Sequence, residues 1–164
     1  MISLLNKYII CFIVGFLSLL DTPLLSQKNS AISWLTFDQL EDSLKSNPKQ
    51  VFVVFYADWC AYCHEMDRVT FTDLEVALLL NNDYYALRMD VETTDTIYFG
   101  EQLFINERTK RRNPVHQIAL MMASRRGKPF SLPAMVIFDE KFAARERYFQ
   151  FLSAEQLIAI LKGS

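Results

Sequence analysis

Apolar side chains follow one another without interruption from Val51 to Tyr56. A β-branched and aromatic run of this length predicts a central strand that is covered on both faces. Residues 84–91 alternate loosely between apolar and polar positions and predict a second strand. A short apolar run at 134–138 predicts a third, and 144–151 predicts a partly exposed antiparallel strand.

Between these strands, apolar residues recur at helical spacing, and residues that commonly start or end helices flank these stretches. Thr36 and Gln39 form a capping-box sequence that opens a predicted helix ending near Ser46. The other predicted helices are Leu74 to Leu80 after Thr72-Asp73, Asn113-Pro114 to about Arg126 before Gly127, and a last helix capped by Ser153.

A small hairpin is predicted at 96–105, with Gly100 and Glu101 at its turn. The basic loop 108–112 follows, and we interpret it as solvated. The order of elements predicts an α/β fold with three layers, in which helices cover both faces of a mixed central sheet.

The composition fits one globular domain with a short extension, since the chain has 164 residues and is 51% hydrophobic. A formal net charge of −2 lacks the excess of positive charge that is typical of nucleic-acid-binding domains. Residues 1–26 combine one lysine with a short apolar run and predict a secretory signal peptide, or alternatively an uncleaved membrane anchor. We therefore expect a domain over 31–164 in a periplasmic or otherwise exported protein.

Cys60 and Cys63 are the two cysteines left when the predicted signal, which contains Cys11, is removed. A pair this close cannot stabilise a fold by closing a loop, so it indicates reactivity. At the amino terminus of a helix, backbone amides and the helix dipole favour the thiolate, which is the reactive form. Cys60 is then expected to be the exposed nucleophile, and Cys63 the resolving thiol one turn deeper.

The segment from Tyr56 to Cys63, Tyr-Ala-Asp-Trp-Cys-Ala-Tyr-Cys, resembles the active-site segment of the thioredoxin superfamily. With the following residues to Asp73, it is most similar to the C-terminal thioredoxin-like domain of the bacterial thiol:disulfide interchange proteins of the DsbD type. The likeness covers roughly 34–162 and is close only over 51–91. It implies a thioredoxin fold and a thiol:disulfide oxidoreductase.

Ser131-Leu132-Pro133 precedes an apolar strand and matches the cis-proline loop of that superfamily. The resemblance implies that Pro133 is cis and belongs to the catalytic site, and that Leu132 offers backbone groups to a substrate chain. Trp59 is expected to shield Cys60 and contact substrates, and Tyr62 is assigned to substrate binding with it.

Two features depart from thioredoxins. A buried aspartate usually lies six residues before the first cysteine, where this chain has Val54. Asp67 matches an acidic position of the DsbD-like segment, and we hypothesise that it tunes proton transfer at Cys63; a solvated surface carboxylate is the alternative. The region 92–113 is longer than a minimal thioredoxin needs, so we expect a hairpin insertion at the edge of the fold.

Alternative functions remain open. Cys60 to His64 also matches the Cys-x-x-Cys-His motif for c-type haem attachment. A structural zinc site would need four ligands, and only His64 and His116 are available beside the two thiols. A thioredoxin-like binding module without catalysis is a third alternative. We interpret His116 as an ordinary helix residue and His64 as an exposed residue of the first helical turn. The alternative for His64 is that its partial positive charge raises the reactivity of the cysteine pair.

The favoured function is reduction of, or electron relay to, disulfides in periplasmic proteins, without cofactor or metal. Expected partners are protein disulfide substrates and a membrane electron donor of the DsbD type, with the protein itself a monomer. The direction of electron flow is not encoded in the motif, because a reductase, an oxidase and an isomerase use the same residues.

Overall fold

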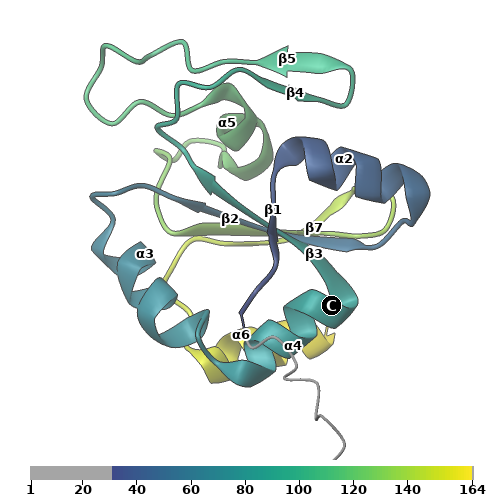
Figure 1. The fold of residues 1–164 in the computed structure, drawn as a ribbon. Coiled ribbons are helices and arrows are strands. Elements are labelled where there is room, and N and C mark those ends of the chain that lie inside the picture. Colours follow the sequence, from purple (N-terminus) through teal and green to yellow (C-terminus); the bar gives the residue numbers. More distant parts are fainter. Residues whose placement is uncertain (1–30, 164) are drawn as a thin grey trace, which may run out of the picture.

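A five-stranded mixed sheet forms the middle layer of residues 31–163, the part of the chain that the computed structural model describes (Figure 1). In chain order its strands are β1 (Trp34–Leu35), β2 (Gln50–Tyr56), β3 (Tyr84–Asp90), β6 (Ala134–Phe138) and β7 (Ala144–Tyr148). They lie side by side in the order β1-β3-β2-β6-β7. The first three are parallel, whereas β6 and β7 are antiparallel to their neighbours.

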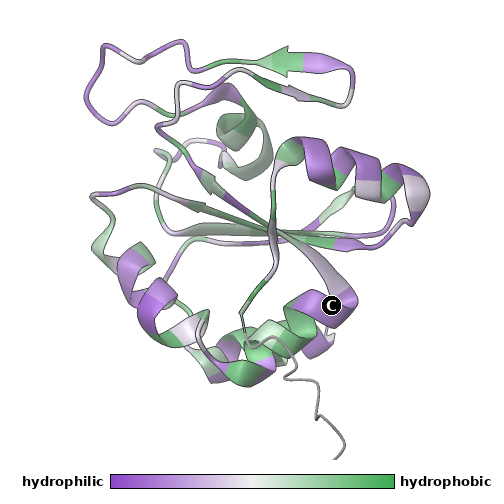
Figure 2. Ribbon diagram, in the orientation of Figure 1, coloured by the Kyte–Doolittle hydropathy of each residue, from purple (hydrophilic) through white to green (hydrophobic). Residues whose placement is uncertain are grey.

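Helices cover both faces of this sheet, which confirms the predicted three-layer α/β arrangement (Figure 1). One face carries α2 (Phe37–Ser46) and α5 (Gln117–Ala123). The other carries α4 (Leu74–Asp83), α6 (Ala154–Gly163) and the segment formed by α3 (Ala61–Glu65) and the π-helix η2 (Met66–Thr70). Figure 2 shows hydrophobic residues gathered on the strands and on the helix sides toward them.

Strand β2 lies at the centre because both of its faces are apolar, as its sequence predicts. Val51, Val53 and Phe55 pack toward α2 and α5. Phe52 and Val54 pack on the opposite face, toward α4 and α6. Since every one of these five side chains is at most 3% exposed, β2 forms a rigid base for the segment that follows it.

The predicted hairpin insertion is present as β4 (Ile97–Phe99) and β5 (Gln102–Phe104). Gly100 and Glu101 form its turn with φ angles of 59° and 63°. Two consecutive positive φ angles define the type I′ turn, which matches the twist of paired strands. Phe99 packs edge-on against Phe37 of α2 at a ring separation of 5.3 Å, so the hairpin extends the core.

Helix α5 differs from its prediction at both ends. It begins at Gln117 and ends at Ala123, inside the predicted limits of Asn113 and Arg126. Asn113 has a φ of 52°, which lies in the left-handed region and cannot start a right-handed helix. His116 supplies the N-cap through its side chain, and Ser124 is already extended. His116 is thus a capping residue, which corrects our interpretation of it as an ordinary helix residue.

The other helix boundaries follow the sequence closely. Thr36 and Gln39 form the predicted capping box of α2. The side chain of Asp73 caps α4, and the hydroxyl of Ser153 accepts a hydrogen bond at the start of α6. Helix α4 continues to Asp83, beyond the predicted end at Leu80. The predicted signal peptide or anchor at 1–26 lies outside the described residues.

Within residues 31–163, none of the helices has the length and apolar character that a membrane crossing requires.

Candidate active site

The two cysteines lie where the central strand ends and the first helix on that side begins. A tight turn after β2 is closed by a hydrogen bond from the Cys60 amide to the Ala57 carbonyl oxygen at 3.0 Å. Cys60 is the N-cap residue of α3, and its Sγ accepts a hydrogen bond from the Cys63 amide at 3.2 Å. The same two residues are joined by a disulfide, so the structure shows the oxidised form.

Both cysteines are 4% exposed, which differs from the expected contrast between an exposed Cys60 and a deeper Cys63. In this oxidised form the Cys60 sulfur is bonded to Cys63 Sγ and also accepts the Cys63 amide, so it lies over the first turn of α3. The sequence motif fixes the spacing of the two sulfurs, whereas their exposure depends on these contacts.

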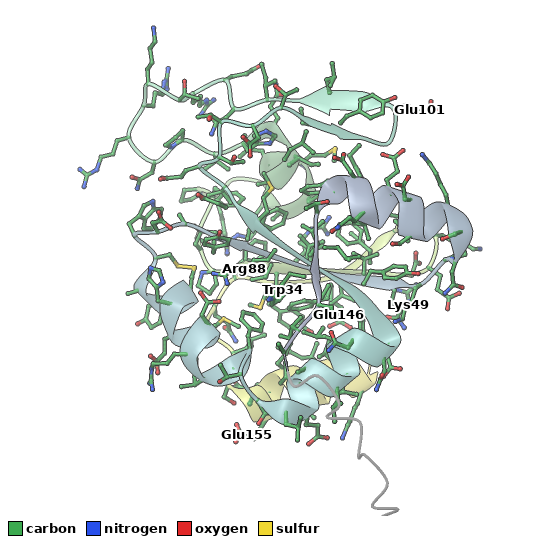
Figure 3. All side chains as sticks on the ribbon, in the orientation of Figure 1. Trp34, Lys49, Arg88, Glu101, Glu146 and Glu155 are labelled. Atoms are coloured by element: carbon green, nitrogen blue, oxygen red, sulfur yellow. A yellow bond between two sulfur atoms is a disulfide. The ribbon has the colours of Figure 1, made fainter. Side chains whose placement is uncertain are left out.

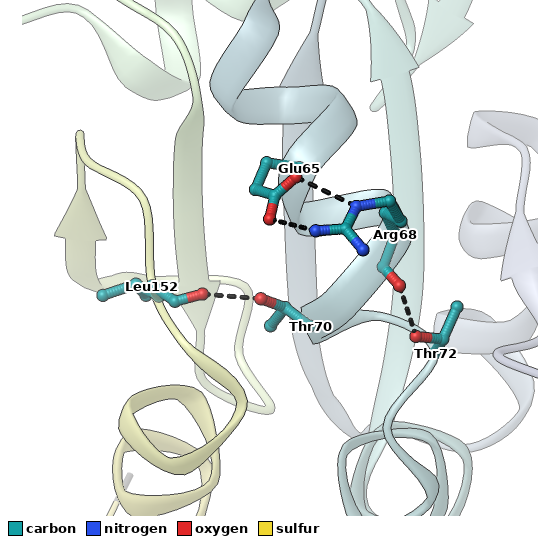
Figure 4. A network of polar contacts seen from close by, with 5 residues as sticks. All are labelled: Glu65, Arg68, Thr70, Thr72 and Leu152. Carbon is teal, nitrogen blue, oxygen red and sulfur yellow. Dashed lines mark hydrogen bonds and ion pairs between the residues drawn. The ribbon is translucent and has the colours of Figure 1, made fainter.

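The helix that carries Cys63 is held in place beyond its first turn (Figure 4). The buried Thr70 hydroxyl, at the end of η2, donates a hydrogen bond to the Leu152 carbonyl oxygen at 2.7 Å. On the exposed side, Arg68 forms an ion pair with Glu65 at 2.6 Å. The Thr72 hydroxyl donates to the Arg68 carbonyl oxygen at 2.8 Å. The buried contact fixes the helix against the segment before α6.

The peptide bond between Leu132 and Pro133 is cis, as the resemblance implies. In the antiparallel pair of β2 and β6, Phe55 lies opposite Ala134. Pro133 therefore lies beside the carboxyl end of β2, the end that leads into Cys60. The sheet brings together two motifs that are 70 residues apart in the sequence.

A small groove of about 90 Å³ connects these two motifs. Trp59 and Leu132, the two residues predicted to contact substrates beside the cysteine pair, both line it. The remaining lining residues come from three connecting segments: Val91, Glu92, Asn113, Pro114, Val115 and Phe130. Tyr62 is 67% exposed but does not line this groove, so its predicted contact with substrates would have to be made from outside it.

Trp59 is oriented by a residue that the sequence analysis did not single out. Its indole Nε1 donates a hydrogen bond to Glu92 Oε1 at 2.7 Å, although 54% of the residue is exposed. An exposed indole with a fixed edge presents a flat apolar face at small conformational cost. No local signal connects these residues, because Glu92 follows β3 and Trp59 follows β2.

Asp67 lies in η2, and its Oδ2 is 2.6 Å from Nη2 of Arg88 on β3. The guanidinium carbon of Arg88 lies 4.1 Å from the ring centroid of Tyr56, on β2. Burial raises the pKa of the Tyr56 hydroxyl, and the charge of Arg88 opposes this change. Asp67 therefore belongs to a polar cluster on the α3 side of the sheet, while Val54 occupies the usual aspartate position as a buried apolar residue.

His64 folds back toward the turn before the disulfide. Its Nε2 lies 2.6 Å from the carbonyl oxygen of Asp58, a distance at which the protonated nitrogen donates. The ring therefore supports the backbone of the Asp58-Trp59 turn. Among the described residues there is no group of three or more His, Cys, Asp or Glu side chains that could hold a metal ion.

Solved structures with the same arrangement define the class of this fold. A thioredoxin from Thermus thermophilus superposes with a TM-score of 0.56 at 18% identity, covering 82% of this chain and 86% of that one. The oxidised C-terminal domain of DsbD from Neisseria meningitidis gives 0.51 at 22% identity, covering 81% and 98%. The protein has the thioredoxin fold. It belongs to the thioredoxin-like family, whose sequence model matches residues 33–139.

Comparison with curated sequences finds relatives among the thiol:disulfide interchange proteins DsbD. The thiol:disulfide interchange protein DsbD of Campylobacter jejuni strain RM1221 is 24% identical over 147 residues, which is 88% of this chain and 22% of that protein. DsbD of Colwellia psychrerythraea is 39% identical over 61 residues, covering 35% and 10%. The chain thus spans less than a quarter of the length of these relatives. Together with the Cys60–Cys63 pair, they relate it to the thioredoxin-like disulfide oxidoreductases.

Proposed function

We propose that the protein is a thiol:disulfide oxidoreductase that reduces, or relays electrons to, disulfides in exported proteins. The observation that carries this proposal is the Cys60 sulfur, which caps α3 and accepts the Cys63 amide at 3.2 Å. An amide that binds this sulfur favours its anionic form over the neutral thiol. Family membership favours this chemistry over haem attachment, although Cys60 to His64 also fits the haem motif. The intact cysteine pair argues against a binding module without catalysis.

The reaction begins from the reduced dithiol. The Cys60 thiolate attacks one sulfur of a substrate disulfide, forms a bond to it and releases the other substrate sulfur as a thiolate, which takes up a proton. Cys63 then loses its proton and attacks the Cys60 sulfur. This breaks the mixed disulfide, releases the second substrate thiolate, which is also protonated, and leaves the Cys60–Cys63 disulfide. Two electrons pass from the protein to the substrate.

The groove between Trp59 and Leu132 is the proposed place for the substrate chain on either side of its cysteine. An extended segment would lie across the indole and pair with the backbone of Leu132, next to Pro133. Tyr62 is 67% exposed on α3 and would contact the same chain from the other side of the disulfide.

Asp67 is the proposed group for proton transfer at Cys63, which precedes it by one helical turn. Its ion pair with Arg88 at 2.6 Å fixes the carboxylate on this face of the helix. The carboxylate would accept the Cys63 proton in the second step and return it when the disulfide is reduced again.

The proposal also includes export of the chain and a membrane protein as its electron donor. Residues 1–26 would direct the chain out of the cytoplasm as a cleaved signal or hold it at the membrane as an anchor. Residues 31–164 would then act as a monomeric domain that receives electrons from a membrane donor of the DsbD type.

The test is trapping of the mixed disulfide by the full-length chain, with Cys11→Ser in all variants so that two thiols are counted. The reduced protein is mixed with a peptide that contains one disulfide, and the products are measured by mass spectrometry. We expect Cys63→Ser to accumulate a covalent adduct with the peptide, and Cys60→Ser to form little of it. Equal adduct with both variants would contradict the assignment of Cys60 as the nucleophile.

The direction of electron flow is read from the equilibrium potential in glutathione and dithiothreitol buffers. A value near ~−270 mV supports a reductase, whereas a value near ~−120 mV would contradict it in favour of an oxidant. A dithiol that never oxidises reversibly would contradict the proposed function itself.

A further inference from the structure

Two basic segments adjoin the groove beside the disulfide. The first is the basic loop, Arg108 to Arg112, which ends directly before Asn113, a lining residue of the groove. The second is the basic turn, Arg125 to Lys128, which leads within two residues to Phe130 on the same groove. In Figure 1 the basic loop extends toward the same side of the molecule as the start of α3.

The charge of this region is opposite to that of the remaining chain. Residues 105–133 carry seven of the 17 lysines and arginines and one of the 19 acidic residues, a net charge of +6 in a chain with −2 overall. The seven basic residues are Arg108, Lys110, Arg111, Arg112, Arg125, Arg126 and Lys128. None of the seven forms an ion pair within residues 31–163, and all except Arg125 are exposed. Figure 3 shows nitrogen-tipped side chains projecting outward from this loop.

The basic loop is fixed to the body of the domain at its base. Asn106 is 7% exposed, and its Nδ2 donates to the Thr93 carbonyl oxygen at 3.1 Å while its Oδ1 accepts the Arg108 amide at 3.2 Å. The Ile105 amide donates to Gln117 Oε1 at 2.9 Å. These contacts hold the start of the loop beside α5.

The basic turn is fixed to the proline loop itself. Arg125 Nη2 donates to the Ser131 hydroxyl at 2.7 Å, and the guanidinium carbon lies 4.1 Å from the ring centroid of Phe149. The one carboxylate that lines the groove, Glu92, is occupied by the indole of Trp59 at 2.7 Å. The six other cations of the two segments face solvent, and none of them forms an ion pair within residues 31–163.

From this arrangement we infer that the groove takes an extended segment of an oxidised protein whose disulfide is flanked by aspartate and glutamate side chains. The inference rests on the proposed function and names its substrate class. Trp59, Val115, Phe130 and Leu132 supply the apolar floor for the chain next to its cysteine. Exposed rim charges of one sign mainly increase the rate of encounter with an oppositely charged partner, and added salt weakens this effect.

The experiment compares three disulfide peptides of equal length, with acidic, neutral or basic residues around the same cysteines. The reduced full-length chain is mixed with each peptide, and the second-order rate of dithiol oxidation is measured at low and high salt. We expect the acidic peptide to react about tenfold faster than the neutral one at low salt, with the basic peptide slowest, and the ratios to shrink at high salt.

Two matched double variants locate the effect. Arg111→Gln with Arg112→Gln removes two charges from the basic loop and should reduce the acidic preference to about threefold. Lys141→Gln with Arg145→Gln removes two charges from a different pocket, lined by Asp139, Glu140 and Glu146, and should leave the preference unchanged. Equal loss in both variants would assign the effect to net charge and overturn the inference.

The outcomes separate this inference from the proposed function. If all three peptides oxidise the dithiol at one rate, the substrate class is wrong while disulfide exchange stands. If none of them oxidises it, the proposed function fails first. Binding to phosphatidylglycerol vesicles that the loop variant abolishes, without discrimination among the peptides, would overturn the inference and assign the cations to a membrane surface.

Discussion

Arg88 Nη2 lies 2.6 Å from Asp67 Oδ2, and this ion pair links the helix that carries Cys63 to strand β3. Both side chains are less than a third exposed, and the guanidinium also packs over the Tyr56 ring. The carboxylate thus has a fixed position one helical turn after Cys63.

Asp67→Asn is expected to slow the Cys63-dependent step at least about tenfold, because the amide cannot accept a proton. The measurement is the rate at which a preformed mixed disulfide on Cys60 resolves, followed as a function of pH. Glu65→Gln, which removes an exposed carboxylate of the same helix, is the control and should leave this rate unchanged. Unaltered thiol pKa values and exchange rates in Asp67→Asn would remove Asp67 from the mechanism.

Glu92→Ala is expected to release the indole of Trp59 and slow exchange with a peptide disulfide by about threefold, since the substrate would then have to order the ring. Glu92→Gln keeps a carbonyl oxygen for the indole N–H and should be close to wild type. Fluorescence anisotropy of Trp59, measured with Trp34→Phe in the background, checks the mobility of the ring. An immobile indole in Glu92→Ala would show that packing alone holds it.

His116→Ala is expected to lower the free energy of unfolding by about 2 kcal/mol, because the fully buried ring caps α5 through Nδ1 and reaches the Asp95 carbonyl oxygen through Nε2. Asparagine is also a good N-cap, so His116→Asn should lose about half as much. Urea unfolding followed by circular dichroism measures both. Equal losses of stability in the two variants would mean that the cap contributes little and that the buried volume of the histidine ring accounts for the effect.

The same histidine predicts a pH dependence of stability. Burial lowers the pKa of His116 below 6.5, with the hydrogen bond to Asp95 as a smaller opposing effect. The unfolded chain therefore binds a proton at a higher pH than the folded protein does. Its contribution to stability is complete above pH 6.5 and declines as the pH falls toward the folded pKa. Between pH 7.5 and 5, wild type should lose more stability than His116→Asn in urea titrations, and parallel losses would contradict the prediction.

Gly100→Ala is expected to destabilise the protein by about 1 kcal/mol, because its φ of 59° disfavours any side chain. A Cβ at this position would meet no atom within 4 Å, so the backbone alone is tested. Glu101, with a φ of 63°, offers the reverse experiment. Glu101→Gly should stabilise the protein by about 0.5 kcal/mol. The glycine relieves the backbone strain at this φ angle, and the greater entropy of glycine in the unfolded chain offsets part of that gain. Thermal unfolding of both variants checks the opposite signs.

Local sequence determined much of the framework. The apolar run of β2, the capping box at Thr36, the cap at Ser153 and the Gly100-Glu101 turn each involve residues only a few positions apart. Their geometry is therefore set by backbone sterics and short-range hydrogen bonds, which a sequence displays directly. The Cys60–Cys63 spacing belongs to the same kind of information, whereas the cis geometry of Pro133 was implied by the resemblance to thioredoxins.

Tertiary structure decided the remaining features of the site. The start of α5 depends on His116. Its ring can cap the helix because it is buried and held by a hydrogen bond to the Asp95 carbonyl oxygen, in the segment before β4. The partners of Trp59 and Asp67 are 33 and 21 residues away in the sequence, and parallel pairing of β2 with β3 brings them into reach. Such pairs leave no periodic signal along the chain, since their contact exists only after strand order and register are fixed. The sequence thus specified the Cys60–Cys63 pair, and the fold decided what surrounds it.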